Sequence, residues 1–226
     1  MDRKTKEFST SDTWLSEKDT TKIAAAILAG GQSRRMGTDK RKLLLGGKTL
    51  QELAAKKLSL FSERYFSVAD DIDQPLPGFV NILDQATECG PLSGMVSVME
   101  KTEAEWVIFI PCDMPMVPQK LLEFILSYRS MENDALILTG NGRAFPVLSA
   151  FRRAAALPIM RKAIQEKRLT LFRLIEKELL PLYIPAERFP GFKPIMLQNI
   201  NTPEDYNHIL SASDLIWRQC TKFSNR

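Results

Sequence analysis

Short runs of hydrophobic residues recur along the chain, and most of them stop at glycine, proline or an acidic residue. Residues 22–28 (KIAAAIL) are almost wholly apolar and end just before Gly30 and Gly31. A run of this kind is typical of a central strand in a parallel sheet, because both faces of such a strand are buried. We predict further strands at Tyr65–Ala69, Phe79–Leu83, Trp106–Ile110 and Ala135–Leu138.

Between these runs the hydrophobic residues follow helical spacing. Thr49–Phe61 carries Leu50, Leu53, Ala54 and Leu58 on one face, which predicts an amphipathic helix. The end of the chain predicts another helix, because Thr202-Pro203-Glu204-Asp205 combines a capping threonine with an acid three residues later. The remaining helices are predicted to begin at Pro91 and to cover Pro118–Tyr128, Phe151–Glu166 and Leu171–Leu179, with Gly191–Ile200 extended.

Strands that alternate with helices predict βαβ units and therefore an α/β fold with a largely parallel sheet. Residues 1–21 are polar and lack periodicity, so we expect a flexible amino-terminal arm there. Residues 22–210 are expected to form one domain, and residues 211–226 the end of the last helix with a short tail.

Composition narrows the class of protein. Hydrophobic residues make up 44% of the 226 residues and charged residues 26%, so the chain can bury a core without disulfides or metals. No apolar run is long enough to span a bilayer, and the first residues lack the apolar segment of a secretory signal. The three cysteines are odd in number and show no paired spacing. A cytoplasmic protein without a membrane partner is expected.

The net charge of +4 is mild, but basic residues gather between Arg34 and Lys48. This positive segment follows the glycines and could attract the phosphates of a small ligand or of a nucleic acid, or it could be a solvated face. It lacks the interleaved aromatic residues of single-strand binders, so we expect no nucleic-acid partner.

The first chemical motif is Leu28–Gly37 (LAGGQSRRMG), directly after the first predicted strand. Glycines let the backbone turn sharply and bring its N–H groups toward phosphates. Arg35, and either Lys40 or Lys42, can add positive charge where a triphosphate would lie. The motif matches neither the dinucleotide signature nor the P-loop. A plain glycine turn is the alternative interpretation.

The second motif is Pro111-Cys112-Asp113-Met114-Pro115, at the end of another buried strand. Ligands of open α/β sheets bind at the carboxyl ends of the strands, so Asp113 is placed to hold a Mg²⁺ ion between phosphate oxygens. Cys112 is interpreted as a buried small side chain because no base accompanies it. The single histidine, His208, lies in the last helix and is expected to be structural. Hydrolase mechanisms that need a His or Cys triad are therefore disfavoured.

The third motif joins Asp84, at the end of a predicted strand, to Gly90-Pro91-Leu92-Ser93-Gly94. Gly90 and Pro91 begin a helix whose free N–H groups could meet a base, a ribose or a phosphate. Alone, this segment is equally well explained as a simple junction between loop and helix.

Together these motifs resemble those of bacterial molybdenum cofactor guanylyltransferases, the molybdopterin-guanine dinucleotide biosynthesis protein A family. LAGGQSRRMGTDK, the Asp84 strand end, GPLSG, PCDMP, the Phe145-Pro146 pair and QNINTPED occur in the same order, from about Lys22 to Ile209. The resemblance implies a Rossmann-like three-layer sandwich with a mostly parallel sheet, of the nucleotide-diphospho-sugar transferase or glycosyltransferase-A type. It also implies transfer of GMP from GTP to molybdopterin carrying molybdenum, with release of pyrophosphate.

The resemblance also implies roles for individual residues. The nucleotide would contact Leu28, Ala29, Gly30, Gly31, Lys40, Asp84, Gly90 and Asp113. Among these, Lys40 resembles a phosphate-contacting lysine, Asp84 a guanosine-binding acid, and Asp113 the acid that binds both GTP and Mg²⁺. Asn199 and Asn201 would lie at the pterin end. The implied partners are GTP, molybdopterin and proteins of molybdoenzyme maturation.

The chain departs from the family pattern in two places. Ser67–Asp70 lacks the asparagine that often follows the second strand, and Arg41-Lys42 stands where small or apolar residues are expected.

In the implied reaction a terminal phosphate of the pterin attacks the α-phosphorus of GTP, so no protein nucleophile is needed. We expect Arg35, Lys40 and Asp113 to be the catalytic residues, with Arg35 and Lys40 stabilising the departing pyrophosphate. Cytidylyl transfer, transfer to a sugar or alcohol phosphate, and a silent binding protein with the same fold are the alternatives. The Gly30-Gly31 pair resembles the guanylyl branch of the family, which favours GTP, and the joint presence of Lys40, Asp84 and Asp113 disfavours a silent protein.

Overall fold

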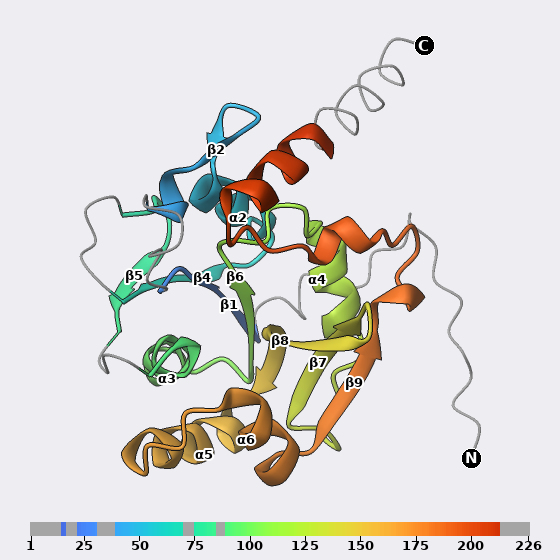
Figure 1. Cartoon of the computed structure of the whole chain (residues 1–226). Helices are drawn as coiled ribbons and strands as arrows, with labels where there is room; N and C mark the ends of the chain where they lie inside the picture. The colour runs from blue at the N-terminus through green and yellow to red at the C-terminus, as the bar shows by residue number, and fades with distance from the viewer. Residues whose placement is uncertain (1–14, 17–21, 31–38, 70–74, 85–88, 213–226) are drawn as a thin grey trace.

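The computed structural model describes residues 15–16, 22–30, 39–69, 75–84 and 89–212. Its centre is a seven-stranded sheet in the order β5-β4-β1-β6-β8-β7-β9 (Figure 1). The strands are β1 (Ile23–Leu28), β4 (Glu63–Val68), β5 (Val80–Leu83), β6 (Trp106–Pro111), β7 (Ala135–Gly140), β8 (Arg143–Arg152) and β9 (Pro181–Pro185). A separate hairpin joins β2 (Leu44–Leu45) to β3 (Lys48–Thr49).

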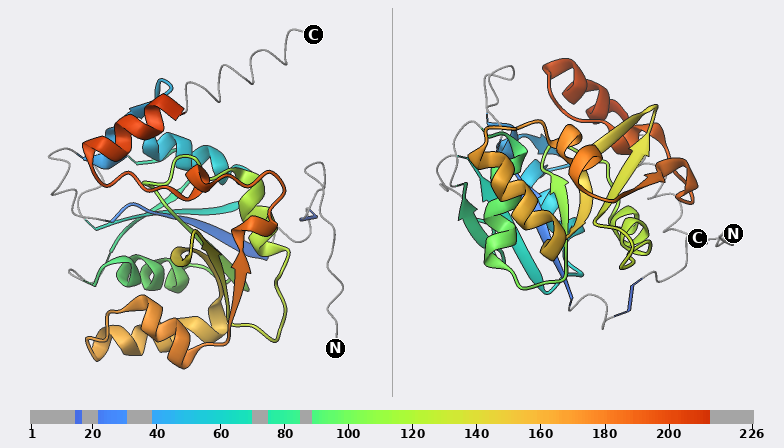
Figure 2. Two further views of the ribbon diagram at one scale, coloured as in Figure 1. Left: turned by 45° about the vertical axis from the view of Figure 1, so that its right-hand side comes forward. Right: turned by 90° about the horizontal axis from the view of Figure 1, so that it is seen from below.

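Helices cover both faces of this sheet and complete a three-layer sandwich (Figure 2). One face carries α2 (Leu50–Lys57), α4 (Gln119–Leu126) and a final helix at residues 203–212. The other carries α3 (Pro91–Lys101), α5 (Arg153–Gln165) and α6 (Leu171–Glu178). Short 3-10 helices lie at η1 (Lys40–Lys42), η2 (Ala186–Arg188) and η3 (Pro194–Leu197).

The apolar run of β1 is explained by its central position. Ala25 and Ile27 belong to the hydrophobic core on the α2 and α4 side, whereas Ala24 and Ala26 belong to the core on the α3 and α5 side. Successive side chains of a strand point to opposite faces, so a strand covered on both sides must be apolar throughout. The predicted central parallel strand is therefore confirmed.

The parallel pairing of β1 and β6 places two of the motifs at one edge of the sheet. Leu28 at the end of β1 pairs with Pro111 at the end of β6, and the Cys112 amide donates to the Leu28 carbonyl over 3.1 Å. The residues that follow each strand, Gly30 and Asp113, therefore emerge at the same carboxyl edge, where open α/β sheets bind ligands.

The sequence did not predict β8, which runs antiparallel to both β6 and β7. Pro146 and an irregular register opposite Ile137 and Thr139 interrupt the regular pattern of this strand, because proline cannot donate to the ladder. Phe151 and Arg152 end β8, so the helix predicted from Phe151 begins at Arg153 instead.

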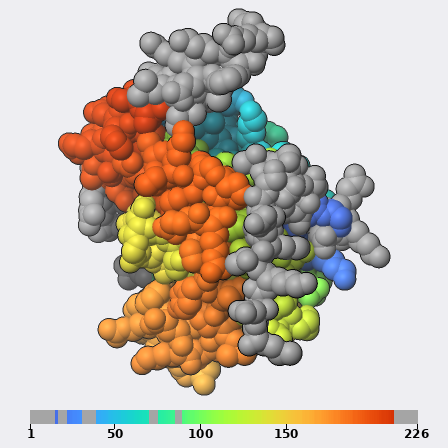
Figure 3. Space-filling view, turned by 90° about the vertical axis from the view of Figure 1, so that its right-hand side faces the viewer, coloured from blue at the N-terminus to red at the C-terminus, as the bar shows by residue number. Residues whose placement is uncertain are grey.

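Three smaller expectations also differ from the structure. The edge strand β9 and the β2–β3 hairpin were not predicted. Gly191–Ile200, expected to be extended, contains the 3-10 helix η3. Figure 3 shows the edge of the molecule where the segment containing β9 lies on the surface.

The final helix begins as its sequence predicts. The Asp205 amide donates to the Thr202 hydroxyl over 3.2 Å, and the Thr202 amide donates to the Asp205 carboxylate over 2.9 Å. This reciprocal pair satisfies donors that an uncapped helix would leave without partners.

One residue of the expected amino-terminal arm packs on the domain. Leu15 is only 6% exposed and belongs to the core on the α2 and α4 side, so the arm is not free of core contacts at this position. The rest of the expected arm, residues 1–14 and 17–21, and most of the expected tail, residues 213–226, lie outside the described residues. Among the described helices, none has the length and hydrophobicity needed to cross a membrane.

Candidate functional site

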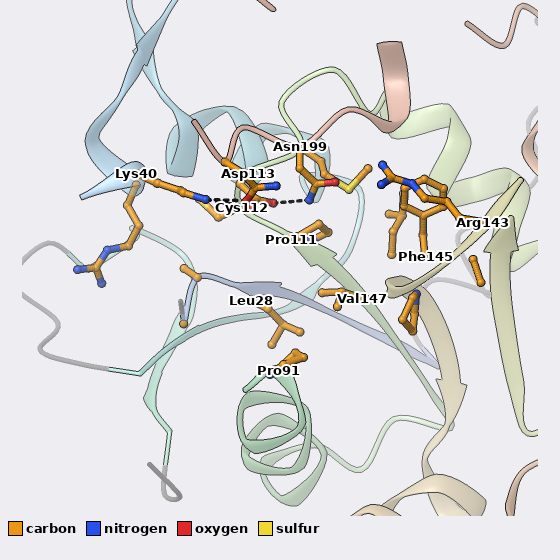
Figure 4. Close-up of a pocket in the computed structure, with 18 of the residues that line it drawn as sticks. Leu28, Lys40, Pro91, Pro111, Cys112, Asp113, Arg143, Phe145, Val147 and Asn199 are labelled. Carbon is orange, nitrogen blue, oxygen red and sulfur yellow. Dashed lines mark hydrogen bonds and ion pairs between the residues drawn. The ribbon is translucent and has the colours of Figure 1, made fainter. Parts of the chain in front are cut away.

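A cavity of about 640 Å³ opens at the carboxyl ends of β1 and β6. Residues from separate parts of the chain line it, including the end of β1, the η1 segment, the loop after β6, and the first half of β8 (Figure 4). Its described lining comprises Leu28, Ala29, Gly30, Asp39, Lys40, Arg41, Pro91, Pro111, Cys112, Asp113, Met114, Arg143, Ala144, Phe145, Pro146, Val147, Leu148, Asn199 and Asn201.

Asp113 is the centre of a polar cluster in this cavity. One carboxylate oxygen accepts a hydrogen bond of 3.0 Å from the Asn199 side-chain amide, and the other lies 3.7 Å from the Lys40 ammonium (Figure 4). The same ammonium donates to the Asn201 side-chain oxygen over 2.9 Å. Four residues that the sequence singled out, from three distant segments, therefore meet around one carboxylate.

Backbone contacts hold these segments together. The Ile200 amide, between the two asparagines, donates to the Asp113 carbonyl over 2.9 Å. Burial raises the pKa of the Asp113 carboxyl, although the Lys40 charge and the Asn199 hydrogen bond act in the opposite direction. A nearby cation stabilises a partly buried carboxylate more strongly than an exposed carboxylate, because less water screens the attraction between the two charges.

A half-buried lysine of α2 forms a hydrogen bond with the loop after Asp113. Lys57, on α2, donates from its ammonium to the Met114 carbonyl over 2.9 Å. Burial of the ammonium lowers the pKa of Lys57 to about 7. Helical spacing places Lys57 on the same face as Leu50 and Ala54, unlike its exposed neighbour Lys56, but no local pattern signals its partner in the loop after β6.

The three basic residues of η1 have different environments. Asp39 caps η1 by accepting from the Arg41 amide, and the Arg41 guanidinium also contacts the Asp39 carboxylate at 2.9–3.0 Å. Burial alone would raise the pKa of Asp39, but its hydrogen bonds and ion pair with Arg41 lower it. Arg41 thus folds onto Asp39, Lys42 is exposed, and Lys40 turns toward Asp113.

A second cluster lies beside Gly30, at the end of β1. The Ala29 amide donates to the Ser67 carbonyl over 2.8 Å, and the Ser67 hydroxyl donates to the Asp84 carboxylate. A Cβ atom on Gly30 would lie 2.9 Å from the Asp84 carboxylate, so only glycine allows this close approach. Asp84 itself is not part of the cavity lining, although it adjoins Gly30, which is.

The helix α3 begins beside the same loop. Gly90 has a φ of +57° and precedes Pro91, which lines the cavity, while Gly90 itself does not. Gly94, one turn into α3, approaches the second cluster closely, since a Cβ atom there would lie 2.6 Å from the Ser67 hydroxyl. The first turn of α3 therefore faces the space between β1 and the Asp84 strand end.

Two predicted site residues, Gly31 and Arg35, lie outside the described residues. Conversely, the sequence did not single out Ser67 or Arg143 as site residues. The Asn141-Gly142 pair, with φ values of 52° and 73°, is the usual signal for a tight hairpin turn and could have predicted where β8 begins. The role of Ser67 depends on a contact with Asp84 that no local pattern encodes.

The donor set fits a magnesium ion better than a transition metal. The described residues contain no group of three or more His, Cys, Asp or Glu side chains that could hold a metal. Mg²⁺ binds through one or two carboxylates together with phosphate oxygens and water, rather than in an all-protein cage. A single half-buried carboxylate such as Asp113, facing an open cavity, matches this requirement.

The structure also places two other side chains with reactive groups, Cys112 and His208. Cys112 is buried, and burial raises the pKa of its thiol to about 12, which agrees with the expectation of a small packed side chain. His208 lies on the final helix, where its Nδ1 is 2.9 Å from the Gln198 side-chain oxygen.

Comparison with known proteins identifies relatives of the whole domain. The family model described as "MobA-like NTP transferase domain" matches residues 25–180. A probable molybdenum cofactor guanylyltransferase of Bacillus cereus is 30% identical, over 82% of this chain and 94% of the relative. One from a Geobacillus species is 28% identical, over 84% of this chain and 99% of the relative.

Solved structures show the same fold. The molybdopterin-guanine dinucleotide biosynthesis protein A from Archaeoglobus fulgidus superposes with a TM-score of 0.73 at 25% identity, over 84% of this chain and 98% of the other. A 2-C-methyl-D-erythritol 4-phosphate cytidylyltransferase from Thermus thermophilus gives 0.63 at 16% identity, over 85% and 98%. The second likeness concerns the fold alone, and both agree with the predicted Rossmann-like transferase architecture.

Proposed function

This chain belongs to the family of MobA-like NTP transferase domains, and we propose that it transfers GMP from GTP to molybdopterin carrying molybdenum, releasing pyrophosphate. The observation that carries the proposal is the cluster of Lys40, Asp113, Asn199 and Asn201 at one end of the cavity. It supplies one half-buried carboxylate and one ammonium at the strand edge where a triphosphate would bind.

The chemistry requires placement and charge neutralisation rather than a protein nucleophile. Asp113 would hold Mg²⁺, which when bound supplies positive charge to the phosphate oxygens. Asn199 donates to one oxygen of Asp113 and so fixes the orientation of the carboxylate. Lys40 would stabilise negative charge on the phosphates, and Arg35 is assigned the same task from the resemblance.

The nucleoside would lie on the opposite side of the cavity, over Leu28, Ala29, Gly30 and Gly31. Asp84 is oriented by the Ser67 hydroxyl and adjoins the Gly30 backbone. A carboxylate there can accept two neighbouring N–H groups, such as those on the edge of guanine, or the hydroxyls of a ribose. Gly90, at the start of α3, completes the proposed nucleotide contacts.

Asn199 and Asn201 would border the acceptor. Their side chains form hydrogen bonds with Asp113 and Lys40, so they would lie beside the phosphates rather than far from the reacting atoms. We therefore assign them to the phosphate end of the pterin substrate.

Turnover of the four nucleoside triphosphates with molybdopterin and Mg²⁺ tests the proposal. GTP should be preferred to CTP by at least about tenfold in kcat/KM, or about 1.4 kcal/mol. Preference for CTP would instead place the chain in the cytidylyl branch. Absence of transfer with every nucleotide would contradict the enzymatic assignment.

Asp113→Asn provides the matched variant for this assay. The substitution keeps the shape of the side chain and an acceptor for Asn199 but removes the negative charge. Transfer should fall by at least roughly a hundredfold at saturating Mg²⁺, with little change in melting temperature. Near-normal turnover in this variant would show that Asp113 does not hold the metal.

A further inference from the structure

The cavity has a neighbouring hollow at the start of β8, beyond the polar cluster around Asp113. This second hollow has a volume of about 350 Å³ and is lined by Thr139, Gly140, Gly142, Arg143, Ala144, Phe172, Tyr183 and Glu187. Arg143 and Ala144 line both spaces, so the two are neighbours at the start of β8. In Figure 4 Arg143 and Phe145 lie on the far side of Asn199 from Lys40.

We propose that the second hollow binds the ring end of the pterin acceptor, between Phe172 and Tyr183, with Glu187 reading its aminopyrimidinone edge and Arg143 holding its phosphate. The proposal rests on the proposed function for the identity of the acceptor. It assigns the ring to side chains of α6, β9 and η2, away from Asn199 and Asn201, and the phosphate to Arg143 of β8.

Arg143 has the charge and the freedom to bind a phosphate. Of the other cations that line the cavity, Lys40 faces Asp113 and Arg41 is paired with Asp39. No carboxylate among the described residues lies within ion-pair distance of Arg143, whose guanidinium instead lies 4.7 Å from the centre of the Phe145 ring. Stacking on an aromatic face orients a guanidinium but leaves its N–H donors available to phosphate oxygens.

The second hollow is lined by two aromatic side chains that remain partly exposed. Phe172 on α6 is 39% exposed, and Tyr183 on β9 is 38% exposed. Both line the hollow. Planar heteroaromatic rings gain most from contacts with such side chains, through stacking or edge contacts.

Glu187 supplies the polar recognition. One of its carboxylate oxygens accepts from the Asn141 amide over 3.3 Å, which tethers the side chain to the β7–β8 turn. No ion pair joins Glu187 to a described cation, so its charge is available to a ligand. The edge of a pterin presents a ring N–H beside an exocyclic amino group, and a carboxylate accepts this pair in a bidentate manner.

Binding of neopterin monophosphate, a fluorescent pterin with a phosphate on its side chain, tests the inference by fluorescence polarisation. Arg143→Ala and Glu187→Gln should each weaken binding by about tenfold, the loss expected for a charge-assisted hydrogen bond. The affinity for GTP should stay within about twofold in both variants. Glu105→Gln, an exposed residue at the opposite end of β6, is the matched control and should bind the probe normally.

Transfer kinetics give the second readout. In both variants the KM for molybdopterin should rise, while the KM for GTP should not. Wild-type probe affinity in Glu187→Gln, no binding of the probe to the wild type, or an equal loss of GTP affinity would overturn the inference. If the wild type binds the probe through these residues but transfers no GMP, the proposed function fails and the pterin site stands.

Discussion

At the scale of single residues, the contrast between Lys40 and Lys42 gives a direct test of the site. Both lie on η1, but only Lys40 has a described contact with Asp113, whereas Lys42 is exposed. Hydrogen bonds from a charged donor to phosphate contribute about 1.5–3 kcal/mol. Lys40→Ala should therefore lower kcat/KM for GTP by roughly tenfold to a hundredfold, and Lys42→Ala by much less.

Steady-state kinetics of the two variants, measured side by side, decide this assignment. Each variant serves as the control for the other, because both remove one positive charge from the same segment. A larger defect in Lys42→Ala would mean that Lys42 is the phosphate-binding lysine.

Lys57 carries an ammonium group whose protonation should affect stability. Its pKa falls from 10.5 in the unfolded chain to about 7 in the folded protein, because burial disfavours the charged form. Between these values the unfolded chain binds more protons, so the free energy of unfolding rises with pH. Below about pH 7 both states are protonated, and the folded state bears the whole desolvation cost.

The difference in unfolding free energy between wild type and Lys57→Met should therefore increase from pH 7 to pH 8.5, by roughly 1 kcal/mol per pH unit. Urea denaturation at several pH values measures it. The range stops at pH 8.5 because the raised pKa of the neighbouring Cys112 thiol has the opposite effect at higher pH. Lys56→Met, which changes an exposed neighbour, should show a difference that does not vary with pH.

The residue scale also shows what could be predicted of the site. Asp113 and Gly30 follow buried strands, and a parallel sheet brings such positions to one edge, so their proximity was predictable. The contacts of Ser67 with Asp84 and of Lys57 with Met114 depend on how α2, α3 and the loops pack. That information is tertiary, and neither spacing nor residue type contains it.

At the scale of elements, the packing of α3 against the sheet depends on Gly94. A Cβ atom there would lie 2.6 Å from the Ser67 hydroxyl and 2.9 Å from a Leu28 methyl group. Gly94→Ala should move α3 away from β1 and lower the free energy of unfolding by about 1–3 kcal/mol. The affinity for GTP should fall as well, because Leu28 lines the cavity.

Chemical denaturation and GTP titration check this prediction. The double variant Gly94→Ala/Ser67→Ala removes the nearest clash and should regain part of the lost stability relative to the sum of the single changes. Strictly additive losses would show that the contact between Gly94 and Ser67 is not the source of the effect.

Some strands could be predicted from the sequence and others could not. The strands β1 and β6 are apolar because both of their faces are covered, and this condition alone identifies them. In contrast, β8 contains Pro146 and an irregular register, and β9 is a short edge strand with prolines at both ends. Their pairing is set by neighbours distant in sequence, so local patterns could not reveal them.

At the scale of the whole molecule, Leu15 extends the folded unit beyond the boundary expected at residue 22. Its side chain is buried in the core on the α2 and α4 side, and burying a leucine stabilises a protein by about 1.5–3 kcal/mol. Leu15→Ser should therefore lower the melting temperature by several degrees. Leu44→Ser is the matched control, since the Leu44 side chain is 56% exposed, and it should change the melting temperature little. Differential scanning calorimetry measures both melting temperatures, and equal values for the two variants would contradict the stabilising role of Leu15.

The bond between Lys40 and Asn201 joins residues 161 positions apart, and that between Asp113 and Asn199 spans 86. On the ribosome, all seven strands of the sheet would be synthesised before either asparagine, since β9 ends at Pro185. The growing chain could therefore assemble its sheet while its polar cluster was still incomplete. A polypeptide ending at residue 198 would contain all seven strands but neither of the asparagines that contact Asp113 and Lys40. Such a product would also lack Ile200 and Ile209, which are buried in the core on the α2 and α4 side, so it would expose hydrophobic surface as well as an incomplete site.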